Sequence, residues 1–527
     1  MKNKNLCIAI LTAGLLVSTV MSCKKDLLKT NPNNLTVSSY FNTSDQIQLA
    51  TNSVYVVLRS YDLMSREWFF VHDMRGDDMA TGGGQLEAAR AQILNGPPDP
   101  TNAVMGAVWT GLYTMIHRAN TVIVNAPRVP STDNPTLVAR CVGEAKFLRA
   151  WAYFDLVTMW GGVPIHTQTV SDPTVYTAKS TPAQVYAQIA ADLKDAIAVL
   201  PNKSGYAAAD LGRATKSAAY MLQARALMQT GDYAGAKAAL LLIPTAGADG
   251  YSLTSRFLDN FEEETEFSQE VIFEVINFDK KDGMFNYGGT GDGINSAQST
   301  LRTQEYNTLA WRNLIPSNKI LNEFESTVTG ATKTDPRYSY SVYQTGDVYN
   351  NGLSVLADAD QNGNSSIVHG VTIKTGWRKY MEIYKMSKAQ AATYYGGNDT
   401  RVYRYAEVLL NLAECENELG NTASAVGYLN QVRARADVLM PPYPTAQYPV
   451  GSKNQVTAAL MHEKSVEMAD EEVRNIDILR WRAKGYYPSI APEPIAFFKA
   501  GRDELLPYPQ SELDNNPLLN HQNNPGY

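Results

Sequence analysis

The sequence predicts a mainly α-helical protein, in which a scaffold of helical hairpins carries an inserted, irregular, loop-rich subdomain with short strands. Three observations support this fold class. Two segments share one hairpin pattern, apolar stripes at three- and four-residue steps extend on both sides of them, and the pattern changes near residue 271. From there to about residue 400 the chain is rich in Gly, Asn, Asp and Tyr, which is typical of long loops.

The two predicted hairpins have the same spacing of small residues. Residues 224–236 follow the pattern Ala-x6-Gly-x4-Ala, and residues 413–425 repeat it. The glycine ends one helix, and Thr422 is expected to cap the next helix in the later hairpin. This spacing resembles that of tetratricopeptide repeats. An ordinary antiparallel helix pair is the alternative, but a repeated spacing favours a tetratricopeptide-like scaffold, which offers a binding surface without identifying the ligand.

The composition indicates a globular protein that does not bind nucleic acid. Of the 527 residues, 44% are hydrophobic and 19% are charged, and the formal net charge is −7. The six histidines show no metal-ligand spacing, and no Gly-x-Ser-x-Gly motif occurs. These patterns favour a protein that is not an enzyme and needs no cofactor. A glycoside hydrolase is the less favoured alternative, because its two carboxylates need no local motif.

Residues 1–22 are predicted to be a lipoprotein signal peptide. Two lysines precede an apolar run over residues 6–20, which is shorter than the ~20 residues of a membrane span. The run ends at Val-Met-Ser-Cys, which resembles a bacterial lipobox with Cys23 as the lipidated residue; a plain secretory leader is the alternative. Residues 23–43 comprise this cysteine and an extended tether. We expect a lipid anchor in the membrane and no membrane-spanning helix.

Two cysteines, Cys141 and Cys415, follow the anchor. Both lie in apolar helix patterns, where a buried free thiol is the usual state. An exported protein can also join two such residues in a disulfide, and the sequence leaves both states open.

Apolar periodicity predicts the helices of the scaffold, which covers residues 44–270 and 401–527. Ser44 or Asp45 begins the first helix. Further helix patterns cover residues 104–125, 135–160, 182–200 and 213–242. Because both ends of the chain contribute helices, residues 44–527 are expected to form a single structural unit.

A polar, glycine-rich loop is predicted over residues 66–85. The aromatic residues 68–70 are expected to lie in the core at its base. Arg75 and Asp77 have no evident structural role, and we expect them to form hydrogen bonds with a ligand.

The insert, residues 271–400, is the predicted ligand-binding region. It opens with the strand pattern VIFEVINF and then carries many Tyr and Trp side chains in loops. Tyr287, Trp311 and Trp377 are candidate stacking platforms for the apolar faces of sugars, and Asn286 is a candidate polar contact. Burial beneath the loops is the alternative for both tryptophans.

One segment of the insert resembles a calcium-binding loop. Asp358, Asp360 and Asn362 follow the spacing of an EF-hand, but the glutamate expected at the twelfth position is missing. A structural calcium ion near these residues is therefore an expectation with an incomplete ligand set.

Five stretches together resemble a known family. They are the lipobox cysteine, EAKFLRA with WGGVP (144–150 and 160–164), YRYAEVLLNLAE (403–414), residues 463–481, and LPYPQSEL with the terminal QNNPGY (506–527). In this order they are similar to SusD/RagB-type lipoproteins, the surface nutrient-binding components of glycan-uptake systems in Bacteroidota. Charged residues within them are expected to pair along helix faces, Asp477 with Arg480 and Arg404 with Glu407.

The resemblance implies a function and a location. It implies a lipid-anchored outer-membrane protein facing the cell surface, which captures oligosaccharide and delivers it to a TonB-dependent, SusC-like transporter. The RagB side of the family implies an alternative, in which the cargo is peptide or another nutrient.

Overall fold

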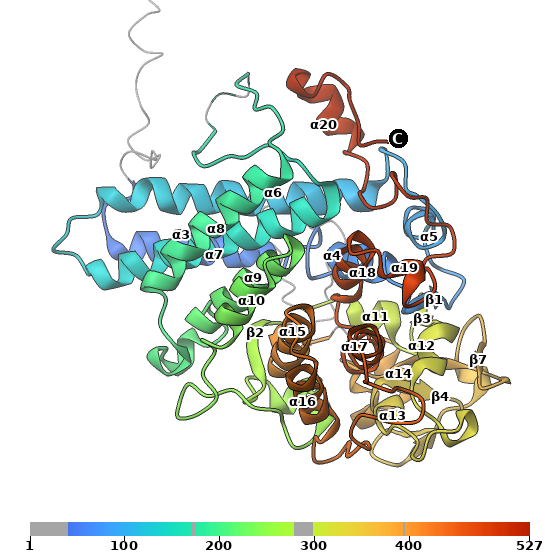
Figure 1. Cartoon of the computed structure of the whole chain (residues 1–527). Coiled ribbons are helices and arrows are strands. Elements are labelled where there is room, and N and C mark those ends of the chain that lie inside the picture. The colour runs from blue at the N-terminus through green and yellow to red at the C-terminus, as the bar shows by residue number, and fades with distance from the viewer. Residues whose placement is uncertain (1–39, 171, 173, 279–298, 394–395) are drawn as a thin grey trace, which may run out of the picture.

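Antiparallel helices packed in chain order form the scaffold in the computed structural model (Figure 1). The structure describes residues 40–170, 172, 174–278, 299–393 and 396–527. The first helices of the scaffold are α3 (Ser44–Leu58), α6 (Ala103–Asn125), α7 (Pro135–Trp160), α8 (Pro182–Val199), α9 (Lys216–Gln229) and α10 (Tyr233–Leu240). Each helix of this series packs against the next one. The predicted mainly α fold class is confirmed.

The two predicted hairpins are α9–α10 and α15–α16, the later pair being α15 (Tyr405–Glu418) and α16 (Thr422–Arg433). Their turn glycines, Gly231 and Gly420, have φ angles of +81° and +87°, in the left-handed region that favours glycine. The matched small residues are buried, so the helices of each pair approach closely (Ala224, Ala236, Ala413, Ala425). Helix α10 also packs against α15, and the second hairpin therefore continues the stack begun by the first.

The cap predicted for α16 is wrong by one residue. Asn421 occupies the N-cap position, and Thr422 is the first residue of the helix. The Asn421 side chain makes no capping hydrogen bond, and its Nδ2 donates to Glu416 Oε2 at 2.8 Å. The two remaining thiols, Cys141 and Cys415, are both buried and free, so the disulfide alternative is not realised.

The insert begins and ends on one antiparallel ribbon. Strand β2 (Val271–Val275) pairs with β10 (Thr400–Arg404), and both are buried along their whole length. The other described strands pair in twos: β1 (Met79–Thr81) with β3 (Leu314–Pro316), β4 (Val342–Gln344) with β9 (Thr375–Trp377), β5 (Val348–Tyr349) with β6 (Ser354–Val355), and β7 (Ser366–Val368) with β8 (Val371–Ile373). Short helices lie between them: α11 (Arg302–Tyr306), α12 (Asn318–Glu323), α13 (Arg337–Ser341) and α14 (Lys388–Ala391).

The remaining helices lie before α6 and after the second hairpin in the chain. Helices α4 (Glu67–Met74) and α5 (Ala88–Asn95) precede α6, whereas α17 (Lys453–Met468), α18 (Arg474–Ala483), α19 (Tyr486–Ser489) and α20 (Gln510–Asn515) follow the second hairpin. Helix α17 packs against α15 and α16 on one side and against α12 and α13 of the insert on another. It therefore forms the boundary between the two parts.

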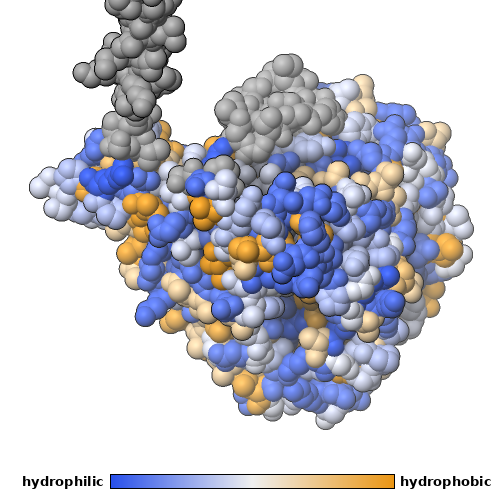
Figure 2. All heavy atoms as spheres, turned by 90° about the horizontal axis from the view of Figure 1, so that it is seen from above, coloured by the Kyte–Doolittle hydropathy of each residue, from blue (hydrophilic) through white to orange (hydrophobic). Residues whose placement is uncertain are grey.

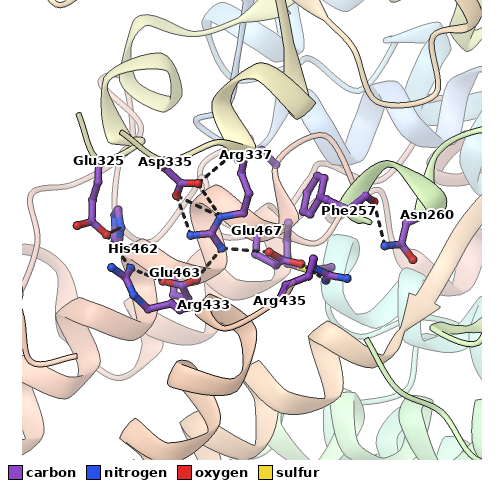
Figure 3. A network of polar contacts seen from close by, with 12 residues as sticks. Phe257, Asn260, Glu325, Asp335, Arg337, Arg433, Arg435, His462, Glu463 and Glu467 are labelled. Atoms are coloured by element: carbon purple, nitrogen blue, oxygen red, sulfur yellow. Dashed lines mark hydrogen bonds and ion pairs between the residues drawn. The ribbon is translucent and has the colours of Figure 1, made fainter. Parts of the chain in front are cut away.

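Buried ion pairs cross this boundary (Figure 3). Arg337, from α13 of the insert, is fully buried and donates to Glu463 at 2.6 Å and to Glu467 at 3.0 Å, both on α17. Its other partner is the neighbouring Asp335, at 2.7 Å. Arg433, at the end of α16, joins Glu463 to Glu325 of the insert, with distances of 3.0 and 2.6 Å. Glu463 is thus shared between an arginine of the insert and an arginine of the scaffold.

Glu467 receives the largest number of these contacts. Arg404 and Arg435 approach its Oε1 at 2.7 and 2.8 Å, in addition to Arg337 at Oε2. Burial alone would raise its pKa, but the three guanidinium groups hold the pKa of Glu467 well below its usual range. The predicted pair of Arg404 with Glu407 is wrong, since Glu407 instead pairs with Arg225 at 2.6 Å. The predicted pair of Asp477 with Arg480 is confirmed at 2.7 Å.

The last segment of the chain packs against the C-terminal end of α7 and forms hydrogen bonds with it. Trp160 Nε1 donates to the carbonyl of Pro507 at 2.9 Å, and Leu506 N donates to Met159 O at 2.7 Å. Asn524 Nδ2 then donates to the carbonyl of Trp160 at 3.0 Å. Two of the stretches that carry the family resemblance, around residues 160 and 506–524, are therefore in direct contact.

Replacing Glu467 by Gln tests the boundary. The variant keeps the shape of the side chain but leaves three buried arginines without their shared charge, so we expect the free energy of unfolding to fall by about 3–5 kcal/mol in urea titrations. Asp195→Asn is the control, because Asp195 pairs with Lys146 at the surface and its side chain is 56% exposed. This control should lose less than about 1 kcal/mol. Equal losses in the two variants would contradict the role given to Glu467.

The pH dependence of stability tests a second contact across the boundary. His462 of α17 is buried between Glu323, at 2.7 Å, and Glu325, at 3.5 Å. Burial lowers the pKa of His462, but these two carboxylates raise it overall, from 6.5 to about 9. The folded state therefore holds the proton more tightly than the unfolded state, and its stabilising effect is complete below pH 6.5 and is lost as the pH rises through about 9.

We expect the free energy of unfolding to fall by about 3 kcal/mol over this pH range, relative to the His462→Gln variant. The measurement is urea unfolding of both proteins at several pH values from 6 to 10. A constant difference between the two proteins would show that His462 is not protonated in the folded state.

Candidate functional site

The glycine-rich loop that follows β1 lies directly on the insert. Gly82 N donates to Asn313 O at 3.0 Å, and Gly83 N donates to Arg312 O at 2.5 Å, which extends the pairing of β1 with β3. A Cβ atom on Gly82 would lie 2.2 Å from Arg312 O, and one on Gly83 would lie 2.3 Å from Trp311 O. Only glycine permits this approach of two backbones. The next residues of the loop, Gly84 and Gln85, are exposed.

Trp311 lies at the edge of this junction. All seven tryptophans belong to the described residues, and Trp311 is the only one whose side chain is not buried. Its backbone N–H donates to Gln304 O at 3.1 Å, and its carbonyl lies beneath Gly83. Partial exposure beside exposed polar residues is the environment that a stacking platform for a sugar requires. Trp311 therefore remains a candidate ligand contact.

Arg312 fixes the underside of the junction. Its side chain is fully buried and donates to Thr375 O at 3.0 and 2.7 Å and to Asn362 O. Burial lowers the pKa of Arg312 to about 10. The loop that contains Asn362 also contacts the glycine loop. Asn364 N donates to Gly82 O at 2.9 Å, and Asn364 Nδ2 donates to Thr81 O at 3.1 Å. The candidate site thus consists of Gly82–Gln85, Trp311 and Asn362–Asn364.

Trp377 does not contribute a stacking surface, which corrects the prediction from sequence. Its side chain has 0% exposure in β9, and its Nε1 donates to Met79 Sδ of β1 at 3.0 Å. A ring with no exposed face cannot stack on a ligand. Its role is to support β1, the strand that leads into the glycine loop, from beneath.

Arg75 has a structural partner that the sequence did not reveal. Its Nη2 donates to the carbonyl of Glu504 at 3.1 Å, and its side chain lines a small cavity of about 50 Å³ that Asp503 and Tyr527 also line. Burial lowers the pKa of Arg75 to about 10. The structure thus places Arg75 against the C-terminal segment and not beside Trp311.

Asp77 also has partners within the protein. Its carboxylate is buried and pairs with Arg474 of α18 at 2.7 Å and with Lys319 of α12. Its carbonyl accepts from Ser317 Oγ at 2.6 Å. Burial raises the pKa of the neighbouring Asp78 to about 6. Asp77 therefore joins the insert to the scaffold, and the prediction of a ligand contact is not supported.

The other two predicted contacts, Asn286 and Tyr287, lie outside the described residues.

The three residues of the predicted calcium loop each contact other parts of the protein. Asp358 accepts from Thr345 Oγ1, Asp360 pairs with Lys388 at 2.7 Å, and the carbonyl of Asn362 accepts from Arg312. Within the described part of the chain, one group of three carboxylates has oxygens close enough together to hold a metal ion. It consists of Glu263, Glu264 and Glu382.

An ammonium group already occupies the centre of that acidic set. Lys385 Nζ lies 3.0 Å from Glu263 and 2.6 Å from Glu264, and it also pairs with Glu382. The three carboxylates therefore have an internal counter-ion.

Two parts of the candidate site were not found from sequence. The glycine run in the sequence indicated the loop that contains Gly82 and Gly83. No pattern in the sequence indicated that this loop would pair with strand β3. Asn364 and Arg312 carried no signal, since their contacts link residues about 50 to 280 positions apart.

Comparison with known proteins places these features in a family. Residues 269–527 match the family model described as "SusD family", and residues 27–228 match the model "Starch-binding associating with outer membrane". SusD-like protein P2 of Formosa agariphila is 27% identical over 98% of this chain and 99% of its own length.

Solved structures share the fold. A SusD superfamily protein from Bacteroides vulgatus aligns with a TM-score of 0.72 at 23% identity, covering 91% of this chain and 98% of that one. Surface glycan-binding protein A from Bacteroides thetaiotaomicron, in complex with laminarihexaose, aligns with a TM-score of 0.68 at 22% identity, covering 90% and 98%. The helical scaffold, the insert and the two matched models lead to one conclusion: the chain belongs to the SusD/RagB family.

Proposed function

We propose that this protein binds oligosaccharide without catalysis and delivers it to a partner transporter of the outer membrane. Membership of the family supports the proposal, as does the similarity of the fold to a protein whose structure contains laminarihexaose. The observation that carries it is the partial exposure of Trp311, alone among the seven tryptophans, beside a loop of polar and glycine residues.

The chemistry of the candidate site suits a sugar. An indole face packs against the C–H groups of a pyranose ring, and amide side chains pair with its hydroxyl groups. Exposed amides lie on both loops that meet here, Gln85 on one and Asn362 and Asn364 on the other. Trp311 would supply the stacking surface, and these amides would supply the polar contacts.

The proposal includes a lipid anchor at Cys23, which lies outside the described residues. The name of one matched family model associates it with the outer membrane. Within the part of the chain that the structure describes, no helix combines the length and the apolar character that crossing a membrane requires. We infer that lipid on Cys23 holds the domain at the outer membrane, facing the cell surface, where a TonB-dependent, SusC-like transporter receives the cargo.

Replacement of Trp311 by Ala tests the ligand class and the site together. We expect loss of the stacking contact to weaken binding of a recognised glycan by about tenfold or more, as measured by calorimetry after a screen of a glycan panel and a peptide panel. Tyr176→Ala is the control, because Tyr176 is 43% exposed on a loop outside the candidate site. Binding of peptides alone would replace the proposal by the alternative of peptide capture.

The glycine loop provides a second test with a matched pair. In Gly82→Ala the new methyl group meets Arg312 O and must displace the loop, so we expect stability to fall by about 1–3 kcal/mol and glycan binding to weaken. In Gly84→Ala no atom lies within 4 Å of the new methyl group, and stability should stay near that of the wild type. Urea unfolding and calorimetry measure the two effects. Similar behaviour of the two variants would argue against the contact between loop and insert.

A further inference from the structure

A second groove lies between α6, the chain that follows α7, and α20. It is open to solvent and has a volume of about 460 Å³, and its described lining combines aromatic rings, imidazoles, hydroxyls, an amide and a carboxylate. Helices α6 and α20 lie at the top of Figure 1, and Figure 2 looks down on that side, where hydrophilic residues predominate and hydrophobic ones form small separate groups. None of the described lining residues belongs to the candidate site around Trp311.

One wall of the groove is aromatic and held in place from behind. Trp109 and Tyr113 follow one another by one turn of α6, with ring centroids 4.9 Å apart. Trp109 also makes T-shaped contacts with Trp160 and Tyr508, at centroid distances of 5.2 and 5.9 Å. The hydroxyl of Tyr113 donates to the carbonyl of Pro164 at 2.8 Å. The wall is therefore formed before any ligand arrives, and only Tyr113 is partly exposed.

The opposite wall is the short helix α20, and it is fixed as well. Leu513 is buried in the hydrophobic core, and Asn516 Nδ2 donates to Thr177 O at 3.0 Å. These contacts leave Glu512 and Asn515, on another face of the helix, to line the groove. Oε1 of Glu512 accepts from Asn516 at 3.0 Å, and no described residue donates a hydrogen bond to its Oε2.

Two imidazole rings complete the polar lining. His117 is exposed, His166 is partly buried, and neither ring forms a hydrogen bond with a residue that the structure describes. Burial lowers the pKa of His166, so its ring is neutral at pH 7 and presents one donor and one acceptor. The groove thus offers unused donors, unused acceptors and a free carboxylate oxygen beside an aromatic wall.

We propose that this groove is a second binding site, which takes uncharged oligosaccharide. Hydroxyl groups of a sugar both donate and accept, which matches the mixed lining, and a carboxylate such as Glu512 can accept from two neighbouring hydroxyls. No lysine or arginine is among the described lining residues, which disfavours sulfated and uronic acid glycans. Most of the described lining residues belong to helices, and the extended segment at Pro164 already pairs with Lys179, which disfavours pairing with an extended peptide. The proposal adds a site to the proposed function and does not depend on Trp311.

The test is hydroxyl-radical footprinting of the full chain in detergent, with laminarihexaose and maltohexaose as neutral probes and an alginate hexasaccharide as the charged comparison. We expect a neutral probe to protect Tyr113 and His117 in the wild type and equally in Trp311→Ala. In Glu512→Gln, which keeps the shape of the side chain, the probe concentration that gives half protection should rise about tenfold. His117→Ala provides a second variant, because its exposed ring supports no described contact.

Asp514→Asn is the matched control, since Asp514 is exposed on the same helix outside the groove. Its footprint should equal that of the wild type. Absence of protection at Tyr113 and His117 with both neutral probes at millimolar concentration would overturn the proposal, and so would protection that neither Glu512→Gln nor His117→Ala reduces. Equal protection by the charged hexasaccharide would refute the ligand class. If the probes fail to protect Trp311 but still protect Tyr113 and His117, the result counts against the proposed function and not against the groove.

Discussion

Buried pairing of arginines with the carboxylates of α17 is the constraint on which the rest of the structure depends. The insert consists of two-stranded ribbons and short helices, and many of its buried apolar side chains belong to the same core cluster as those of the scaffold. Its attachment uses Arg337 and Glu325, whose partners Glu463, Glu467 and Arg433 belong to the scaffold. A buried charge is stable only while its partner is present, so separating the two parts would expose unpaired charge on both. The insert and the scaffold are therefore expected to unfold together.

The same constraint positions the candidate site. Arg404 ends β10, the strand that closes the insert, and its guanidinium reaches Glu467 and Glu471. Asp77, which precedes the glycine loop in the chain, pairs with Arg474 and Lys319. A binding surface made from loops acquires a fixed shape in this way, because charged residues on the rigid helices hold the loops at both ends.

The scaffold could be predicted from sequence because its signals are local. The small residues and glycines of the two hairpins lie within thirteen positions of one another, and they form the turns and close contacts that such spacing predicts. The pairing of Arg404 with Glu407 failed for a physical reason: Arg404 belongs to a strand and α15 begins only at Tyr405, so the helical spacing rule does not apply. Local patterns are reliable only inside the element that generates them.

The site was less predictable, because burial and ion pairing are properties of the whole fold. Trp311 and Trp377 lie in similar polar surroundings in the sequence, yet the pairing of β9 with β4 and the contact with Met79 bury only Trp377. Arg75 and Asp77 looked free because their partners, Glu504 and Arg474, are about 400 residues away.

The contact between the end of α7 and the C-terminal segment has a consequence for when the protein folds. The indole of Trp160 donates to Pro507, 347 positions later, and the carbonyl of Trp160 accepts from Asn524. Contacts of such long range close large loops and form late. An early helix that is completed only by the last residues cannot reach its native packing while the chain is still being synthesised.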